Sequence, residues 1–310
     1  MEKKIIYQID SLYRDTFRVN GFEFGEGKKS VCIVGNMRGN EYQQIYTCAK
    51  LVQEFKQLEE QGRIKEGHKI LVIPSVNPYS ANVKKRFWPT DNTDINRMFP
   101  GYDLGETTQR IAGGVFEEIK DYEIGMQFSS YYMPGKFIPH VRMMQTGFEE
   151  TELAKDFGFP YVICRKVRPY DTGTLNYNWQ IWETKAFSIY TDTTDEIHEE
   201  SAKEAIKGIL RFLAKQGIIT YKTSGGFQST VLTDVDLKSV RTHTAGIFEC
   251  IADVGTRVEK GQIIARVLDP LDAEVKEELI APVDGLVFFA HNEPLTYADT
   301  AVIKLIVEEE

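Results

Sequence analysis

Residues 31–41 read VCIVGNMRGNE, an apolar run that a glycine stops, followed by a short polar loop. A short, continuous apolar run that ends at a turn signal is typical of a buried strand in a mostly parallel sheet. Directly after it, residues 41–61 place Cys48, Leu51 and Phe55 at helical spacing. The stretch therefore predicts a strand, a loop and an amphipathic helix, which is the unit from which α/β sheets are built.

The alternation of strands and helices continues as far as residue 222. Two short strands are expected within residues 3–24, around the turn-forming sequence SLYRD. Further strands are expected at 70–77, 122–128, 137–143, 160–165 and 186–191, and further helices at 106–121 and 197–216. Strands that alternate with helices indicate a mixed, mostly parallel sheet with helices on both faces. We therefore predict an α/β domain over residues 1–222.

The texture of the sequence changes at about residue 223, where short β-rich runs with glycine-marked turns replace helical periodicity. Residues 223–310 are predicted to form a small all-β barrel or sandwich. The turns VEKGQ and APVDG resemble those of lipoyl and biotinyl barrels. Such barrels carry a modified lysine between their halves, as Asp-Lys-Ala or Met-Lys-Met, whereas this region reads DPLDAEVKEELIAP. We interpret Lys276 as a solvated surface charge rather than an attachment lysine.

The composition argues against several classes of partner. The 310 residues carry a formal net charge of −9, which would repel the phosphate backbone of a nucleic acid. The amino end has no apolar stretch of signal-peptide length, and no run approaches the roughly 20 apolar residues that cross a bilayer. Four cysteines are scattered singly, as expected for reduced thiols: Cys32, Cys48, Cys164 and Cys250. We expect a cytoplasmic protein without nucleic-acid or membrane partners.

Three stretches carry a family resemblance, and they follow one another in the order and at the separations of a known family: GNMRGNE at 35–41, RFWPTDNTDINRMFPG at 86–101 and PHVR at 139–142. The second belongs to a long polar loop, and loops of that length inside a compact domain are often functional. Together the three stretches resemble the succinylglutamate desuccinylase and aspartoacylase family. Members of that family are zinc-carboxypeptidase-like enzymes that hydrolyse an amide between an acyl group and an amino acid. The resemblance covers almost the whole chain, because the family often carries a C-terminal barrel.

The resemblance implies three zinc ligands, and this sequence departs from them. In the family the first stretch reads Gly-x-x-His-Gly-x-Glu; here Arg38 stands at the histidine and Glu41 remains. The third ligand, another histidine, falls on Gln127. A guanidinium has no lone pair to offer, and an amide oxygen is a poor zinc ligand. We expect no zinc here, and we predict that Arg38 sits in the metal's place, neutralised by Glu41, with Gln127 accepting a hydrogen bond.

A further departure concerns the general base. The family carries a glutamate on a late strand, and the matching run AFSIYTD places Tyr190 at that position. An unperturbed tyrosine has a pKa of about 10, so it cannot serve as the carboxylate base. Asp192 is two residues further on and therefore on the same face of the strand, which leaves it as an alternative, shifted base.

The part of the family site that holds the substrate's carboxylate is better preserved. Arg86, Asn96 and Arg97 match the residues that grip the carboxylate, and Arg142 lies in the stretch that lines the site. An arginine binds a carboxylate through two parallel charge-assisted hydrogen bonds. The alternative is that Asn96 and Arg97 only brace the long loop. We interpret His140 as a hydrogen-bonded structural residue rather than a metal ligand.

Three hypotheses of different classes follow. The first is a non-catalytic relative that needs no cofactor, acting as a structural or regulatory partner in an oligomer of its own or with an active paralogue, or binding an acidic metabolite. The second is an active N-acyl amino acid amide hydrolase or acyltransferase that uses a displaced metal, or a metal-free route through Asp192, Tyr190 or His140. In the third, residues 223–310 form a protein interaction module and the large domain is its scaffold.

Overall fold

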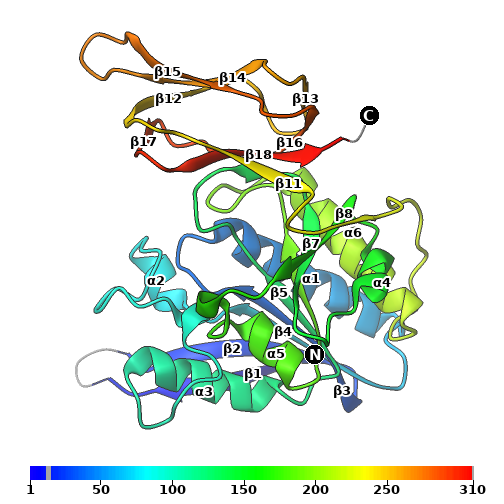
Figure 1. Ribbon diagram of the computed structural model, residues 1–310. Helices are drawn as coiled ribbons and strands as arrows, with labels where there is room; N and C mark the ends of the chain where they lie inside the picture. The colour runs from blue at the N-terminus through cyan, green and yellow to red at the C-terminus, as the bar shows by residue number, and fades with distance from the viewer. Residues whose placement is uncertain (12–14, 309–310) are drawn as a thin grey trace. The chain divides into compact units, whose positions relative to one another are not determined.

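The computed structural model describes residues 1–11 and 15–308, which fall into two compact units (Figure 1). The first unit comprises Met1–Ser130, Pro139–Thr191 and Asp195–Val231. The second comprises Tyr131–Ile138, Asp192–Thr194 and the chain from Leu232 onward. Three residues of the predicted SLYRD turn, 12–14, lie outside the described part of the chain.

The first unit is built on a nine-stranded sheet with the order β1-β2-β4-β3-β5-β9-β7-β8-β10. Its strands are β1 (Glu2–Ile9), β2 (Phe17–Phe24), β3 (Gly27–Asn36), β4 (Gly67–Ser75), β5 (Ile124–Phe128), β7 (His140–Gln145), β8 (Tyr161–Lys166), β9 (Lys185–Tyr190) and β10 (Thr230–Leu232). The neighbouring pairs β4/β3, β3/β5, β5/β9 and β7/β8 are parallel, whereas β1/β2, β2/β4 and β9/β7 are antiparallel. The predicted mixed sheet is therefore confirmed.

Helices cover both faces of this sheet. The longer ones are α1 (Tyr42–Glu60), α3 (Thr107–Ile119), α5 (Leu175–Ile181) and α6 (Glu199–Lys215). Short helical segments are α2 (Pro78–Asn82), η1 (Ile95–Arg97), α4 (Thr151–Ala154), η2 (Lys155–Phe157) and η3 (Pro169–Asp171). Helix α5 was not expected from the sequence, and the long loop after β4 contains α2 and η1.

Alternating residues of the central strands show how the two faces are divided. On β3, Val31 and Ile33 belong to the hydrophobic cluster that contains the apolar residues of α1 and α6. The intervening Cys32 and Val34 belong to the cluster that contains those of α3 and α5. Successive side chains of a strand point to opposite faces, so β3 is buried on both faces from Ser30 to Asn36.

The topology brings the polar stretches of the sequence to one edge of the sheet. Strands β3, β5 and β9 run parallel, so their carboxyl ends meet at the same edge, which is the usual place for ligand sites in α/β sheets. Strand β7 runs the other way and begins at this edge, where His140 lies opposite Tyr190. The loop after β3 carries the GNMRGNE stretch to the same edge.

The second unit is a sandwich of two antiparallel sheets. One has the order β11-β18-β16-β13 with β6 also paired to β16, and the other has the order β15-β14-β12-β17. The strands are β6 (Lys136–Phe137), β11 (Leu237–Arg241), β12 (Gly246–Cys250), β13 (Arg257–Val258), β14 (Ile263–Leu268), β15 (Val275–Ile280), β16 (Gly285–Ala290), β17 (Leu295–Thr296) and β18 (Ala301–Val307). Lys276 lies on β15, 3.6 Å from the carboxylate of Asp269.

Two details differ from the expectations drawn from the sequence. The single strand predicted at 137–143 is wrong: β6 pairs in the second unit, whereas β7 belongs to the sheet of the first. Residues 138 and 139, which join them, end in proline, and a proline cannot donate a ladder hydrogen bond.

Among the helices of residues 1–11 and 15–308, none has the length and apolar character that a membrane span requires.

Candidate functional site

The loop between β3 and α1 places Arg38 and Glu41 at the carboxyl edge of the sheet. Gly39 allows the loop to lie close to the chain after α2: its amide donates to the carbonyl of Arg86 at 2.9 Å. A Cβ on Gly39 would lie 2.1 Å from the carbonyl oxygen of Lys85. A side chain at this position would therefore push the loop away and carry Arg38 with it.

The guanidinium of Arg38 is buried, with 5% of the residue exposed, and it lies between two carboxylates. Its Nε and Nη2 both donate to Asp94 Oδ2, at 3.0 and 2.8 Å, and its Nη1 donates to Glu41 Oε1 at 3.2 Å. Burial alone would lower the pKa of Arg38, but the charges and hydrogen bonds of Asp94 and Glu41 outweigh it and raise the pKa above its usual value. Arg38 is a permanent, internally neutralised cation.

The carboxylate of Glu41 accepts hydrogen bonds on both oxygens. Oε2 accepts from the backbone amides of Met37 and Arg38, at 2.9 and 3.0 Å. Oε1 accepts from Arg38 Nη1 and from the hydroxyl of Ser130, the latter at 2.5 Å. Only 1% of Glu41 is exposed. Its lone pairs are therefore directed at donors that the fold holds in place.

Asp94 takes the role that the sequence analysis gave to Gln127. The guanidinium donates its hydrogen bonds to the two carboxylates, so the expected bond to the Gln127 amide is wrong. A carboxylate is the stronger partner because it adds its charge to the hydrogen bond. Asp94 was missed, although it stands in the quoted 86–101 stretch, two residues before Asn96. The available signal was an acidic residue in this loop of the motif cluster, together with an arginine at the position of the family's histidine.

Arg97 and Asn96 brace the loop in this structure. Arg97 Nη1 donates to the carbonyl of Tyr170 at 2.6 Å and lies 3.6 Å from Asp171, while its Nε is 4.0 Å from Asp94. Asn96 Oδ1 accepts from the amide of Leu175 at 3.2 Å and so fixes the start of α5. These contacts favour the bracing role. Grip on a ligand carboxylate stays a prediction for both residues.

The arginines and carboxylates of this region form one alternating chain of charges. Arg38 pairs with Asp94, which also faces Arg97, and Arg97 faces Asp171. Asp171 is 1% exposed and also pairs with Arg165, at 2.6 Å. The chain connects the loop after β3, the long loop and the segment before α5, so three parts of the edge are held by charge pairs that neutralise one another.

Arg86, another predicted carboxylate ligand, is half-buried beside the same loop. Its Nη1 lies 3.5 Å from Asn40 Oδ1, and its guanidinium lies over the ring of Phe87 at 5.6 Å. The first contact is at the limit of a hydrogen bond, so it restrains the side chain weakly.

A row of polar side chains crosses the sheet beneath α5. Gln127 on β5 pairs in register with Ser188 on β9, which pairs in turn with Arg142 on β7. All three lie on the face opposite Val141 and Ile189, whose side chains belong to the α1 and α6 cluster. The row therefore lies on the α5 side of the sheet, within its carboxyl edge.

Tyr190, at the position of the family's glutamate, is tied to Arg142 and His140. The guanidinium of Arg142 lies 4.4 Å from the centroid of the Tyr190 ring, and its Nη1 donates to the tyrosine oxygen at 3.4 Å. Arg142 Nη2 is 3.2 Å from His140 Nε2, and the rings of His140 and Tyr190 stack at 4.5 Å. The fully buried His140 thus makes the hydrogen-bonded, structural contacts expected of it.

Asp192, the alternative base, lies beyond the end of β9. The strand ends at Tyr190, and the backbone carbonyl of Asp192 accepts from the amide of Phe137 at 3.1 Å, within the second unit. The idea that Asp192 shares the strand face of Tyr190 assumed that β9 continues, so it loses its geometric basis. A catalytic role for Asp192 is left as a prediction.

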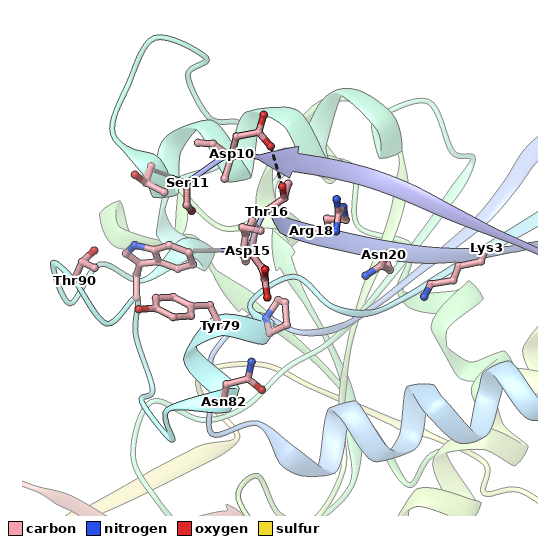
Figure 2. A pocket seen from close by; sticks show the side chains of 15 residues that line it. Lys3, Asp10, Ser11, Asp15, Thr16, Arg18, Asn20, Tyr79, Asn82 and Thr90 are labelled. Atoms are coloured by element: carbon pink, nitrogen blue, oxygen red, sulfur yellow. Dashed lines mark hydrogen bonds between the residues drawn. The ribbon is translucent and has the colours of Figure 1, made fainter. Parts of the chain in front are cut away.

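A cavity of about 670 Å³ lies elsewhere in the first unit (Figure 2). Tyr79 and Trp88 form an aromatic wall with ring centroids 5.3 Å apart, and the polar side includes Asp10, whose carboxylate accepts from Thr16 Oγ1 at 3.0 Å. None of the site residues discussed above lines it. We assign this cavity no ligand.

The described residues also contain no ready metal centre. Within residues 1–11 and 15–308, no group of three or more His, Cys, Asp or Glu side chains is arranged to hold a metal ion. At the aligned ligand positions Glu41 is accompanied by the guanidinium of Arg38, which has no lone pair for a metal, and by the neutral amide of Gln127. The carboxylate of Asp94 accepts hydrogen bonds from Arg38.

Comparison with known proteins connects this geometry to a family. The model of the succinylglutamate desuccinylase/aspartoacylase catalytic domain matches residues 27–215. A curated relative, the N-alpha-acetyl-L-2,4-diaminobutyric acid deacetylase of Halomonas elongata, is 27% identical over 259 residues, which cover 79% of this chain and 72% of the relative.

Solved structures show the same fold along nearly the full length. A succinylglutamate desuccinylase from Silicibacter sp. TM1040 superimposes with a TM-score of 0.83 at 19% identity, covering 99% of this chain and 93% of that one. The product-bound ectoine utilization protein EutE (DoeB) from Ruegeria pomeroyi gives a TM-score of 0.81 at 21% identity, covering 95% of this chain and 92% of that one. The predicted mixed α/β sheet with helices and an added C-terminal β domain is thereby confirmed as the fold of these structures.

Proposed function

We propose that this chain, which belongs to the succinylglutamate desuccinylase/aspartoacylase family, binds a small carboxylate-bearing amide without hydrolysing it through zinc. One observation carries the proposal: the guanidinium of Arg38, at the position where the motif resemblance predicts a zinc-ligand histidine, pairs with both Glu41 and Asp94. A divalent ion placed beside Glu41 would meet this fixed positive charge at close range, in a buried setting where repulsion is poorly screened.

The donor set supports the same conclusion. Zinc requires imidazole, thiolate or carboxylate donors, usually three from the protein at a catalytic site. Of the three aligned positions only Glu41 carries such a donor, and its oxygens already accept from two backbone amides, Arg38 and Ser130. The nearby carboxylate of Asp94 accepts from Arg38. Gln127 offers only a neutral amide. The residues present do not fit the metal that intact relatives use.

The proton chemistry of hydrolysis is also poorly provided for. The position of the family's glutamate holds Tyr190, whose hydroxyl accepts from the guanidinium of Arg142. A phenol is neutral and does not replace the carboxylate that activates water in such a mechanism. The group formed by Arg142, Tyr190 and His140 is better suited to holding a ligand than to activating water.

The class of ligand follows from the cations and from the relatives. Arg142 is held beside Tyr190 and His140 near the carboxyl edge of the sheet, and Arg86 lies close to the loop that carries Arg38. Guanidinium groups in such positions favour a carboxylate partner. The relative in Halomonas elongata is named for an N-acetylated amino acid, so we take N-acyl amino acids as the class to test.

The test combines binding, turnover and metal content in one set of purified proteins. The native chain is expected to bind an N-acetyl amino acid in calorimetry, to release no acetate with zinc supplied, and to lose about tenfold or more in affinity in Arg142→Gln. Zinc-dependent release of acetate by the native chain would refute the proposal.

A designed variant sharpens the metal part of the test. Arg38→His, Gln127→His and Tyr190→Glu together restore the family's donor set and should let the chain retain one zinc after gel filtration. Arg257→His, which adds a histidine at an exposed position of the second unit, is the matched control and should retain none. Equal zinc retention by the native chain and the triple variant would contradict the role given to Arg38.

A further inference from the structure

A second buried guanidinium lies on α6, on the face of the sheet opposite α5. Arg211 is 8% exposed. Its Nη1 donates to the carbonyl of Phe157, and its Nη2 makes a long hydrogen bond of 3.4 Å to the carbonyl of Ser224. Gly226 packs so closely that a Cβ there would lie 2.8 Å from the central carbon of the guanidinium. The chain at 224–226 therefore lies directly against Arg211.

The charge of Arg211 is only partly compensated by these contacts. A guanidinium has five N–H donors, and here two backbone carbonyls accept from it, while in the described residues Nε has no acceptor. Carbonyls carry no net charge, so they satisfy donors without neutralising the cation. A buried charge is costly unless an opposite charge accompanies it, as Asp94 and Glu41 accompany Arg38.

A small pocket of about 80 Å³ opens beside Arg211. Its lining supplies cationic and hydroxyl groups: Lys207, Arg211, Tyr221, Lys222, Thr223 and Ser224. The charge of Lys207 is balanced by Glu204, which lies 2.7 Å away. The remaining positive charge of the pocket comes from Arg211 and Lys222. The chain has a net charge of −9, so a pocket whose described lining has three cations and no carboxylate differs in charge from the protein as a whole.

We infer that this pocket binds a phosphate group. The volume suits one tetrahedral oxyanion rather than a larger molecule. Arg211 and Lys222 would supply charge, and Thr223 and Ser224 would supply hydroxyl donors, which together match the oxygens and the double negative charge of a phosphate. The ligand is either inorganic phosphate or the phosphate of a monoester whose remainder extends from the pocket mouth. This site is separate from the candidate site around Arg38 and does not depend on the proposed function.

The experiment measures binding of inorganic phosphate to the full chain by calorimetry, with sodium chloride of equal ionic strength as the reference. Saturable binding is expected, together with a rise in the unfolding temperature that chloride does not reproduce. Lys222→Ala is expected to weaken the affinity about tenfold, since hydrogen bonds to charged groups are of that strength. Glycerol phosphate, measured beside inorganic phosphate, identifies which source binds more tightly, and saturable binding of either supports the inference.

Lys215→Ala is the matched control. Lys215 is also on α6 and carries the same charge, but it pairs with Asp156 at 2.8 Å and does not line the pocket. Its removal should leave the affinity for phosphate unchanged. The inference is overturned if phosphate and glycerol phosphate bind no better than chloride, or if Lys222→Ala and Lys215→Ala weaken binding equally. Arg211→Lys keeps the charge but loses the planar set of guanidinium donors. The affinity of this variant for phosphate should fall, while its unfolding temperature in chloride stays near that of the native chain.

Discussion

Arg38 and Arg211 are both buried guanidinium groups of the first unit, but their surroundings differ. Arg38 is enclosed by Asp94 and Glu41, and the charge chain extends through Arg97 to Asp171. Arg211 is enclosed by two backbone carbonyls and borders a small pocket. In the first arrangement the positive charge of the guanidinium is neutralised by carboxylates of the same chain. The positive charge of the second is not balanced by a carboxylate of the described residues, and this contrast underlies the two proposals: Arg38 in place of a metal, and Arg211 as part of an anion site.

The largest effect is expected from removing the centre of the charge chain. Arg38→Ala leaves Glu41 and Asp94 buried without their cation, which should lower the free energy of unfolding by about 3–5 kcal/mol. Urea denaturation of the metal-free protein measures it. The exposed Arg257→Ala should stay within about 0.5 kcal/mol of the native chain. If Arg38→Ala were equally close to native, the charge chain would have no structural importance.

Removing the partner that sequence analysis missed should have a smaller effect. Asp94→Asn keeps the shape of the side chain but takes one carboxylate from Arg38, leaving Glu41 as its counter-charge. We expect a loss of about 2 kcal/mol. In an Arg38→Met background the same change should cost much less, because the interaction has already been removed. Additive losses in that double-mutant cycle would contradict a direct coupling of the two side chains.

Arg211 should matter less for stability than Arg38. Arg211→Met gives up two hydrogen bonds to carbonyls but also removes a partly compensated buried charge, so a net loss of about 1 kcal/mol is expected in phosphate-free buffer. Urea denaturation in matched buffers measures this difference. In saturating phosphate the gap between Arg211→Met and the native chain should widen, because only the native chain gains from the ligand. A gap that phosphate leaves unchanged would argue against an anion at Arg211.

The smallest effect concerns a carboxylate near the surface of the second unit. Burial tends to raise the pKa of Glu277, but hydrogen bonds from His243 and Thr244 outweigh it and lower the pKa below its ordinary 4.5. A lowered pKa means that Glu277 stabilises the fold above pH 4.5 and that this contribution is lost as the pH falls through the lowered value. Glu277→Gln should remove less than about 1 kcal/mol at pH 7, with the difference shrinking towards pH 3. A difference that grows on acidification would show the opposite sign.

The regular part of the fold was predictable because it depends on local patterns. The apolar runs at 31–36 and 70–77 appear as β3 and β4, and the periodic stretch at 41–61 appears as α1. Helix α5 was not predicted, because Asn176, Asn178 and Gln180 are buried polar residues that hide the helical apolar period. Their burial depends on partners elsewhere in the chain: the Gln180 amide, for example, donates to the carbonyl of Met144 at 2.9 Å.

The candidate site was predictable at the level of residue types but not of pairings. The motif positions identified Arg38, Glu41 and Tyr190, and the topology brings all three to one edge of the sheet. The partners of Arg38 and Arg97 could not be read from the sequence, because Asp94 is 56 residues from Arg38 and Asp171 comes from the segment before α5. Such contacts depend on how three loops pack together, and no spacing rule encodes that.

The central claim is that the guanidinium of Arg38 has replaced the metal of the family's site. Elemental analysis of the chain, purified without chelators from its native host, tests this most directly. The account predicts zinc far below one ion per chain, together with unchanged stability when a chelator is added. One zinc per chain, lost from the Glu41 site upon chelation together with stability, would contradict it.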